Sequence, residues 1–187
     1  MAKIGLTNFR YGVLTEATDG TPTYGGPLTP GKAVSCTVDI TNNDASLYAD
    51  DALAESDTSF AGGTVTMGID EADLTTMANL LGHNLTSGGI MTRSTDDVAP
   101  YVGLGRIVTK MVSNVQKFKV EFLYKVKFSE PSQDNQTKGE SVEFSTTEIQ
   151  GTVAALANGK WSVTQEFTTK EAALTYLESL LGTTTSH

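Results

Sequence analysis

The amino-acid sequence predicts a mainly β protein with flanking helices. The strongest observation is the stretch from Val115 to Phe128, in which apolar and charged residues alternate almost without error. Side chains alternate across a strand with a period of two, so this stretch is a long strand with one buried face. Eighteen glycines and many threonines also favour strands joined by tight turns. A strand well above the usual ~5–6 residues suits an extended sheet, a barrel wall or an assembly.

The alternation assigns each residue of this strand to a face. We expect Phe118, Val120, Phe122, Tyr124, Val126 and Phe128 on the apolar face. Lys117, Lys119, Glu121, Lys125 and Lys127 fall on the polar face, with Leu123 as the one exception. Together with Arg106 and Lys110, these lysines make up almost half of the basic residues, which leaves a nucleic-acid patch as an alternative to a solvated polar face.

Composition indicates one domain over residues 1–187, long enough to bury a core. The net charge of −9 disfavours electrostatic binding of nucleic acid by the whole protein. The polar N-terminus predicts no signal peptide, and no apolar run approaches the roughly 20 residues of a membrane span. The single cysteine, Cys36, excludes an internal disulfide and fits synthesis in a reducing compartment.

The first third of the chain reads as strands separated by a loop. Residues 3–15 and 33–41 have alternating apolar residues, and residues 16–32 between them are rich in Gly, Pro and Thr. We expect residues 42–60 to form a long acidic loop, which is uncommon in a compact domain unless it is functional or disordered. Residues 63–69 predict the next strand.

The middle of the chain predicts a helix and a hairpin. Apolar residues at helical spacing predict a helix over 71–81, with Asp70 as its N-cap and Gly82 as its end. Strands are expected over 87–92 and 100–112. The turn Val112-Ser113-Asn114-Val115 then leads into the long strand and sets a register in which Arg106 faces Glu121 and Lys110 faces Lys117.

The last third predicts two strands and a helix. A loop over 129–139 leads to a strand over 140–156, and centring that loop places Lys125 opposite Glu143. Asn158-Gly159 is typical of a type I′ turn leading back through Trp161. A C-terminal helix follows over about 169–181, capped by Thr169.

The sequence contains no recognisable catalytic or metal-binding motif, so we expect neither an enzyme nor a bound cofactor. Of the two histidines, His187 is terminal, and His83 follows a helix end, where a capping role is expected. No histidine pattern supports Cys36 as a nucleophile. The carboxylates of the acidic loop do not match an EF-hand, so a solvated loop is expected there, with metal binding as the alternative.

Several short motifs, in their order and spacing along nearly the whole chain, resemble the major tail proteins of long, non-contractile-tailed phages. They are Tyr11-Gly12-Val13-Leu14-Thr15-Glu16, Thr23-Tyr24-Gly25-Gly26-Pro27, Leu47-Tyr48-Ala49-Asp50-Asp51, Ala99-Pro100-Tyr101-Val102-Gly103-Leu104-Gly105, Lys125-Val126-Lys127-Phe128-Ser129-Glu130-Pro131, Thr137-Lys138-Gly139-Glu140-Ser141-Val142-Glu143-Phe144, Gly151 and Gly159-Lys160-Trp161. The sequence departs from the usual pattern at Ser113-Asn114, where an Asn-Gly turn is expected.

The resemblance implies a β-sandwich or barrel of the phage tail-tube type and a structural role in the virion tail. Family members are assembled in the cytoplasm of the bacterial host into hexameric rings, which stack into a tube through which DNA leaves. The implied partners are the chain itself and the tape measure, tail terminator and distal tail proteins, with DNA passing only transiently. A tube subunit of a tailocin or a secretion device is a close variant.

Two sets of residues follow as candidates for the assembly. The docking residues of the acidic loop predict a contact between stacked rings, made by Leu47, Tyr48, Asp50, Asp51, Leu53 and Phe60. Because DNA must slide past the channel wall, an acidic or neutral wall is expected, and the strand carboxylates that are candidates for it are Asp39, Glu121, Glu143 and Glu148. The competing hypothesis is a free-standing β-sandwich that binds a carbohydrate or a receptor, which would be monomeric.

Overall fold

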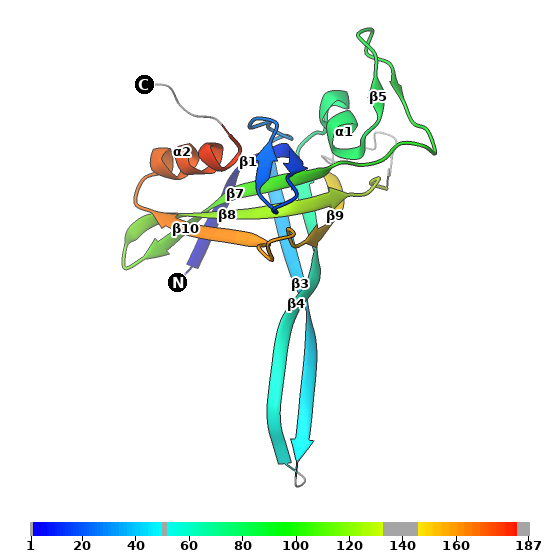
Figure 1. Cartoon of the computed structure of the whole chain (residues 1–187). Helices are drawn as coiled ribbons and strands as arrows, with labels where there is room; N and C mark the ends of the chain where they lie inside the picture. The colour runs from blue at the N-terminus through cyan, green and yellow to red at the C-terminus, as the bar shows by residue number, and fades with distance from the viewer. Residues whose placement is uncertain (1, 50–51, 133–145, 183–187) are drawn as a thin grey trace, which may run out of the picture.

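The computed structural model describes residues 2–49, 52–132 and 146–182, and it is mainly β, as the sequence predicts (Figure 1). In chain order the elements are β1 (Ala2–Glu16), β2 (Pro22–Tyr24), β3 (Ala33–Ala49), β4 (Ala52–Ile69), α1 (Leu74–Leu81), β5 (Asn84–Leu85), β6 (Met91–Thr92), β7 (Tyr101–Val112), β8 (Val115–Phe128), β9 (Thr147–Ala154), β10 (Ser162–Phe167) and α2 (Lys170–Leu180). The large sheet is antiparallel, with the order β2-β1-β7-β8-β9-β4-β3 and with β10 also paired to β8.

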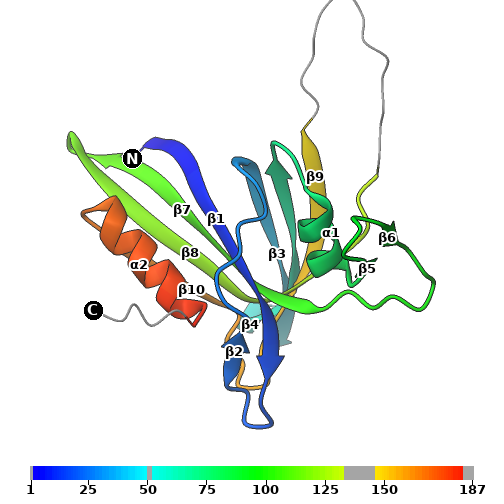
Figure 2. The ribbon, with the colours of Figure 1, turned by 90° about the horizontal axis from the view of Figure 1, so that it is seen from above.

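The large sheet divides at β8 into two lobes. Residues 118–123 of β8 pair with β10, and residues 125–128 pair with β9, so the two strands follow one another along the same side of β8. The first lobe contains β1, β7, β10 and the first part of β8. The second lobe contains β3, β4 and β9. Seen from above, the two lobes diverge in the shape of a V, with α2 against the first lobe and α1 beside the second (Figure 2).

Two groups of buried side chains hold this arrangement together. The larger group lies between the lobes and includes Phe9, Tyr11, Met67, Phe128 and, from α1, Leu80. The smaller group fills the space between the first lobe and α2. It consists of Tyr24, Ile107, Val120, Phe122, Ala173, Leu177 and Leu181. Each sheet face that meets another element therefore buries apolar side chains, which is the main source of folding free energy.

The predicted hairpin between β7 and β8 is confirmed. Ser113 and Asn114 have φ angles of 49° and 63°, the two positive values that a type I′ turn requires. The register is also the predicted one, because Arg106 faces Glu121 and Lys110 faces Lys117. A two-residue turn of this type therefore determines the pairing up to Leu104, where the register shifts.

The prediction that one face of β8 carries all six alternating apolar residues holds through Tyr124 and is wrong for Val126 and Phe128. Val120 and Phe122 face α2, whereas Val126 and Phe128 join Leu123 in the core between the lobes. The β7–β8 register shifts by one residue between the pairs Leu104–Leu123 and Val102–Val126. Such a bulge reverses which face each later residue occupies. Leu123, the exception in the sequence pattern, marks the place where β8 changes its buried face.

Both predicted helices are present. Thr169 caps α2 by accepting a hydrogen bond from the backbone N–H of Ala172. Gly82 ends α1 in the left-handed conformation, as predicted, but the N-cap is Asp73 and not Asp70. The predicted strand over 87–92 is also shorter, because only Met91–Thr92 is extended.

Residues 42–60 do not form the predicted loop. Their described part belongs to β3 and β4, which pair with each other from Ala33–Ile69 to Ala49–Ala52. The body pairs β4 with β9 only from Gly63 onwards, so the distal part of the hairpin projects from the body as an arm (Figure 1). We call residues 41–49 and 52–60 the arm. The strands of the arm could not be recognised in the sequence, because a strand is identified by alternating apolar residues and the arm is largely polar.

The predicted pairing of Lys125 with Glu143 is wrong. The residue of β9 opposite Lys125 is Ala154, and the Lys125 ammonium binds the Glu16 carboxylate at 2.6 Å. Glu143 itself lies outside the described residues. The prediction failed because it assumed a short, symmetrical connection, whereas β9 begins only at Thr147.

The turn at Asn158-Gly159 is present but has a different type. Only Gly159 has a positive φ, of 82°, and its N–H binds the carbonyl of Leu156. This is a three-residue turn with glycine in the left-handed position, in place of a type I′ turn. It leads the chain from β9 to β10, both of which pair with β8.

Candidate assembly surfaces

The arm is a two-stranded ladder outside the body. Residues 41–49 and 52–60 pair only between β3 and β4, whereas the same strands in the body are part of a larger sheet. Asn42, Asn43, Asp44, Thr58 and Ser59 are exposed. A lone hairpin is at best marginally stable in water, because it has no third strand or helix on which to bury a face. In the described chain, the arm thus lacks the third strand that supports β4 in the body.

The structure places the predicted ring-contact residues along this arm. By register, Leu47 lies opposite Glu55 and Tyr48 opposite Leu53, near the tip. Asp50 and Asp51 lie outside the described residues. Phe60 differs from the others, because it lies at the base of the arm and its ring stacks on Trp161 with centroids 4.7 Å apart. Phe60 therefore connects the arm to the body of its own chain.

A free strand edge adjoins the arm. In the described chain β3 pairs only with β4, so its other edge between Ala33 and Ile40 offers unpaired backbone groups. The side chains beside this edge are partly apolar: Val34 is 51% exposed and Ile40 is 37% exposed. Free edges with exposed apolar residues favour pairing with another chain.

The outer face of the second lobe is broad and polar. The registers of β3, β4 and β9 align three rows of residues that point to this side. The rows are Ser35–Gly68–Glu148, Thr37–Thr66–Gln150 and Asp39–Thr64–Thr152. Two of the four predicted channel carboxylates, Asp39 and Glu148, therefore share this face, and both are exposed. The rows carry no lysine or arginine until Lys127, which lies opposite Thr152 on β8.

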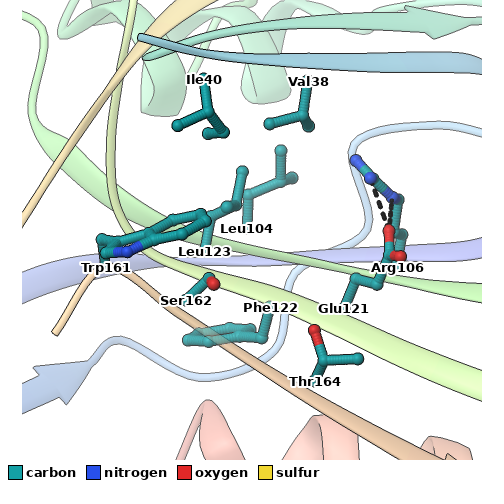
Figure 3. A pocket seen from close by; sticks show the side chains of 10 residues that line it. All are labelled: Val38, Ile40, Leu104, Arg106, Glu121, Phe122, Leu123, Trp161, Ser162 and Thr164. Atoms are coloured by element: carbon teal, nitrogen blue, oxygen red, sulfur yellow. Dashed lines mark hydrogen bonds and ion pairs between the residues drawn. The ribbon is translucent and has the colours of Figure 1, made fainter. Parts of the chain in front are cut away.

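Glu121, a third predicted channel carboxylate, is not on this polar face. It lies in a cleft between the lobes (Figure 3). A cavity of about 160 Å³ separates Val38 and Ile40 of β3 from Leu104 and Leu123 of the first lobe. Glu121 lies at its polar end, where its carboxylate forms an ion pair with Arg106 and another with Lys119. Burial opposes ionisation, but the hydrogen bond from Lys119 and the charge of Arg106 outweigh it and hold the pKa of Glu121 below its usual range.

Cys36 lies beside this ion pair. A guanidinium nitrogen of Arg106 lies 2.6 Å from its sulfur. Burial raises the pKa of the Cys36 thiol, although Arg106 acts in the opposite direction. A reactive cysteine needs a lowered pKa, so this environment does not favour a nucleophile.

Most lysines of β7 and β8 have carboxylate partners. Lys110 binds Glu166 at 2.7 Å, Lys119 binds Glu121, and Lys125 binds Glu16 at 2.6 Å. Lys125 and Lys127 also lie over the ring of Tyr101, at 4.8 and 5.5 Å from its centroid. Neighbouring carboxylates and an aromatic ring therefore offset much of this positive charge.

The surroundings of His83 were not predicted from the sequence. This side chain is only 8% exposed, and each of its ring nitrogens meets a carboxylate: Asp97 at 2.7 Å and Glu130 at 2.8 Å. Arg93 binds the other oxygen of Glu130 at 2.8 Å. The hydrogen bond with Asp97, opposed by burial and supported by Glu130, raises the pKa of His83. The cluster joins the end of α1 to the end of β8, and no local sequence signal indicates contacts across 14 and 47 residues.

Among the residues that the structure describes, no three His, Cys, Asp or Glu side chains gather in a way that would hold a metal ion. Neither described helix is long and apolar enough to cross a membrane. No protein-family model matches the chain, and no curated protein matches it significantly.

Proposed function

We propose that this chain is a structural subunit of a phage tail tube, which assembles into stacked hexameric rings. The observation that carries the proposal is the arm, a paired hairpin that projects from the body and has no sheet neighbour of its own there. Ordering a residue costs about 1–2 kcal/mol, and packing normally offsets this cost. A second subunit would supply the missing packing.

The arm is suited to the contact between successive rings. Leu47, Tyr48 and Leu53 lie near its tip by register, and Asp50 and Asp51 fall in the connection between its strands. We retain these five residues as the ring contact. Phe60 has a different role in the proposal: its stacking on Trp161 anchors the base of the arm to the body.

The free edge of β3 supports lateral assembly within a ring. Backbone groups between Ala33 and Ile40 have no second strand among the described residues, and a neighbouring subunit would satisfy them. A contact between two different surfaces closes into a ring when the rotation between subunits permits it. The finer fold type, a tail-tube sandwich whose sheets continue from one subunit to the next, is part of this proposal.

The polar face of the second lobe has the chemistry expected of a channel wall. Its rows of Ser, Thr and Gln carry the carboxylates of Asp39 and Glu148, which would repel phosphates and let DNA pass. Glu121 does not fit this role, because its charge is paired within the cleft. Glu143 lies outside the described residues and remains a candidate from sequence alone.

The virion tail is the location that this proposal implies, with assembly in the cytoplasm of the bacterial host. The tape measure, tail terminator and distal tail proteins are the further partners that it implies. A tailocin or a secretion device would use the same subunit contacts.

The alternative is a monomeric module that binds a carbohydrate or a receptor, and the cleft that contains Trp161 favours it. However, one face of the Trp161 ring is already stacked on Phe60 and is not available for a sugar.

Sedimentation and negative-stain imaging of the purified chain, at rising concentration, test the proposal. We expect rings or tubes in which mass grows by whole rings, whereas the alternative predicts a monomer throughout. A strict monomer at every concentration, together with normal tail assembly when the protein is absent, would exclude the tube.

A further inference from the structure

Three lysines form a row across neighbouring strands at one end of the first lobe. Lys110 of β7 lies opposite Lys3 of β1 on one side and opposite Lys117 of β8 on the other. We call these three residues the lysine row. Like charges directly opposite one another destabilise a sheet. Sheets therefore avoid such rows unless an anion is close by.

The chain supplies only part of the required negative charge. Among the described residues, Glu166 is the carboxylate that binds this row, through Lys110 at 2.7 Å. The same glutamate lies opposite Lys119 in the β8–β10 register. Lys117 makes none of the ion pairs found in the described part of the chain, although it is only half-buried. The row therefore keeps a positive charge on a chain whose net charge is −9.

The row lies on the face of the first lobe that α2 does not cover, and the Lys110 side chain in it is 16% exposed. α2 packs on the opposite face of the lobe, where Ile107, Val120 and Phe122 are buried against it. The lysine row lies close to the β7–β8 turn, where Val115 is 55% exposed. In Figure 2 this end of the first lobe lies away from β3 and β4.

The arm has the complementary charge. Residues 41–60 include five acidic residues and no lysine or arginine, and Asp44, Glu55 and Asp57 lie in the paired part of the hairpin. In the described chain, the strands of the arm pair with no strand other than each other. The lysine row thus has fewer carboxylates than lysines, and the arm carries carboxylates on a segment that projects from the body.

We propose that the acidic arm of one copy of this chain docks on the lysine row of a second copy. The inference rests on the proposed self-assembly and names the receiving surface for the arm. A second copy is a better occupant than a nucleic acid. The chain as a whole is strongly acidic and repels phosphates, whereas the arm of every subunit supplies carboxylates.

A charge swap tests the pairing in the full chain. The row variant combines Lys110→Gln with Lys117→Glu, and the arm variant combines Asp44→Lys with Asp57→Asn. Each changes the net charge by the same amount in opposite directions, so the combined variant restores the wild-type charge. The matched control for the row variant combines Lys160→Glu with Lys170→Gln, at two exposed positions away from the row. Thermal unfolding identifies variants that are unfolded, and these are replaced by Lys117→Gln and Asp44→Asn alone.

The readout is the critical concentration for polymerisation at low salt. We expect the row and arm variants each to raise it about five- to tenfold, the fold-change for about 1–1.4 kcal/mol per contact. The combined variant should recover most of this loss, and the control should not differ from the wild type. The differences should shrink at about 1 M salt, where the screening length falls to about 3 Å.

Carbodiimide crosslinking gives a second readout that does not depend on tubes. In a mixture of ¹⁴N- and ¹⁵N-labelled protein, we expect mixed-isotope peptides that join Glu55 or Asp57 to Lys110 or Lys117. The Lys110–Glu166 pair should crosslink within one copy and serves as the internal reference.

Two outcomes would overturn the docking while leaving the tube intact. One is that the wild type polymerises and that the row and arm variants have the same critical concentration as the wild type. The other is that the row variant polymerises normally but no longer binds duplex DNA that the wild type binds. This result would assign the row to nucleic-acid binding. A wild-type chain that never polymerises would instead contradict the proposed function.

Discussion

In the body of this protein, β3 and β4 belong to a larger sheet, whereas in the arm the same two strands pair only with each other. In the body they place Val65, Met67 and Ile69 in a core where none of the three is exposed. In the arm, most of the residues with described side chains are exposed and polar. Hydrogen-bonded pairing and burial are therefore separate contributions to stability: the body has both, and the described part of the arm has mainly the first. Loss of core packing should unfold the body, and loss of the arm should affect assembly alone.

The largest expected effect is in the core beneath α2. Phe122 is fully buried and meets the rings of Tyr24 and Tyr124 edge-on at 5.5 Å. Phe122→Ala should lower the free energy of unfolding by about 3–5 kcal/mol, because it leaves a cavity in a rigid environment. Urea unfolding measures this, and Phe122→Leu should cost clearly less. A loss below about 1 kcal/mol would mean that packing against α2 adds little to the stability of the body.

Backbone packing at the end of α1 should have the next largest effect. Gly82 has a φ of 77°, and a Cβ there would lie 2.2 Å from the carbonyl oxygen of Val98. Gly89 has nearly the same φ, 78°, but open space around it. Gly82→Ala should cost about 1–3 kcal/mol and more than Gly89→Ala, which is subject to the conformational strain alone. Equal losses in thermal unfolding would contradict the close packing of Gly82 against residue 98.

A smaller and pH-dependent effect is expected at His83. Its pKa is raised in the folded protein, so the protonated ring stabilises the fold. This contribution is complete below the unfolded pKa of about 6.5 and disappears as the pH rises through the higher folded value. Wild type should therefore lose stability relative to His83→Gln as the pH rises from about 6 to 9. A constant difference across this range would contradict the protonated cluster with Asp97 and Glu130.

The smallest effect on folding is expected from shortening the arm. Asn43 and Ser59 are opposite one another, so an Asn-Gly pair can replace residues 44–58 and close the hairpin with a two-residue turn. The free energy of unfolding should change by less than about 0.5 kcal/mol, as for other surface changes. Ring or tube formation should nevertheless stop, as electron microscopy would show. A body that unfolds with the arm removed would contradict the separation of the two regions.

A single change at the arm tip separates folding from assembly in the same way. Tyr48→Ala should weaken tube growth more than it weakens folding, because Tyr48 lies by register near the tip of the arm. Light scattering during polymerisation and urea unfolding of the same sample make the comparison. Unchanged growth would remove Tyr48 from the proposed contact.

The local features could be predicted from the residues that form them. Val115–Leu123 is a strand with the predicted alternation, Ser113-Asn114 forms the predicted turn, and Thr169 and Gly82 delimit the helices. These features depend on residues within about one helical turn or one strand length, which a period or a cap residue reports directly. The mainly β fold follows from the same signals.

How distant segments meet depends on the packing of the whole chain. The bulge after Leu123 changes the buried face of β8, because the first part of this strand packs against α2 and its last part packs between the two lobes. The described side chains of the arm are mostly exposed and polar, and its sequence shows no alternation that would identify strands. The cluster of His83, Asp97 and Glu130 and the pairing of Lys125 with Glu16 join residues far apart in the chain. Such contacts depend on which registers bury the most apolar surface overall, and no local pattern encodes that choice.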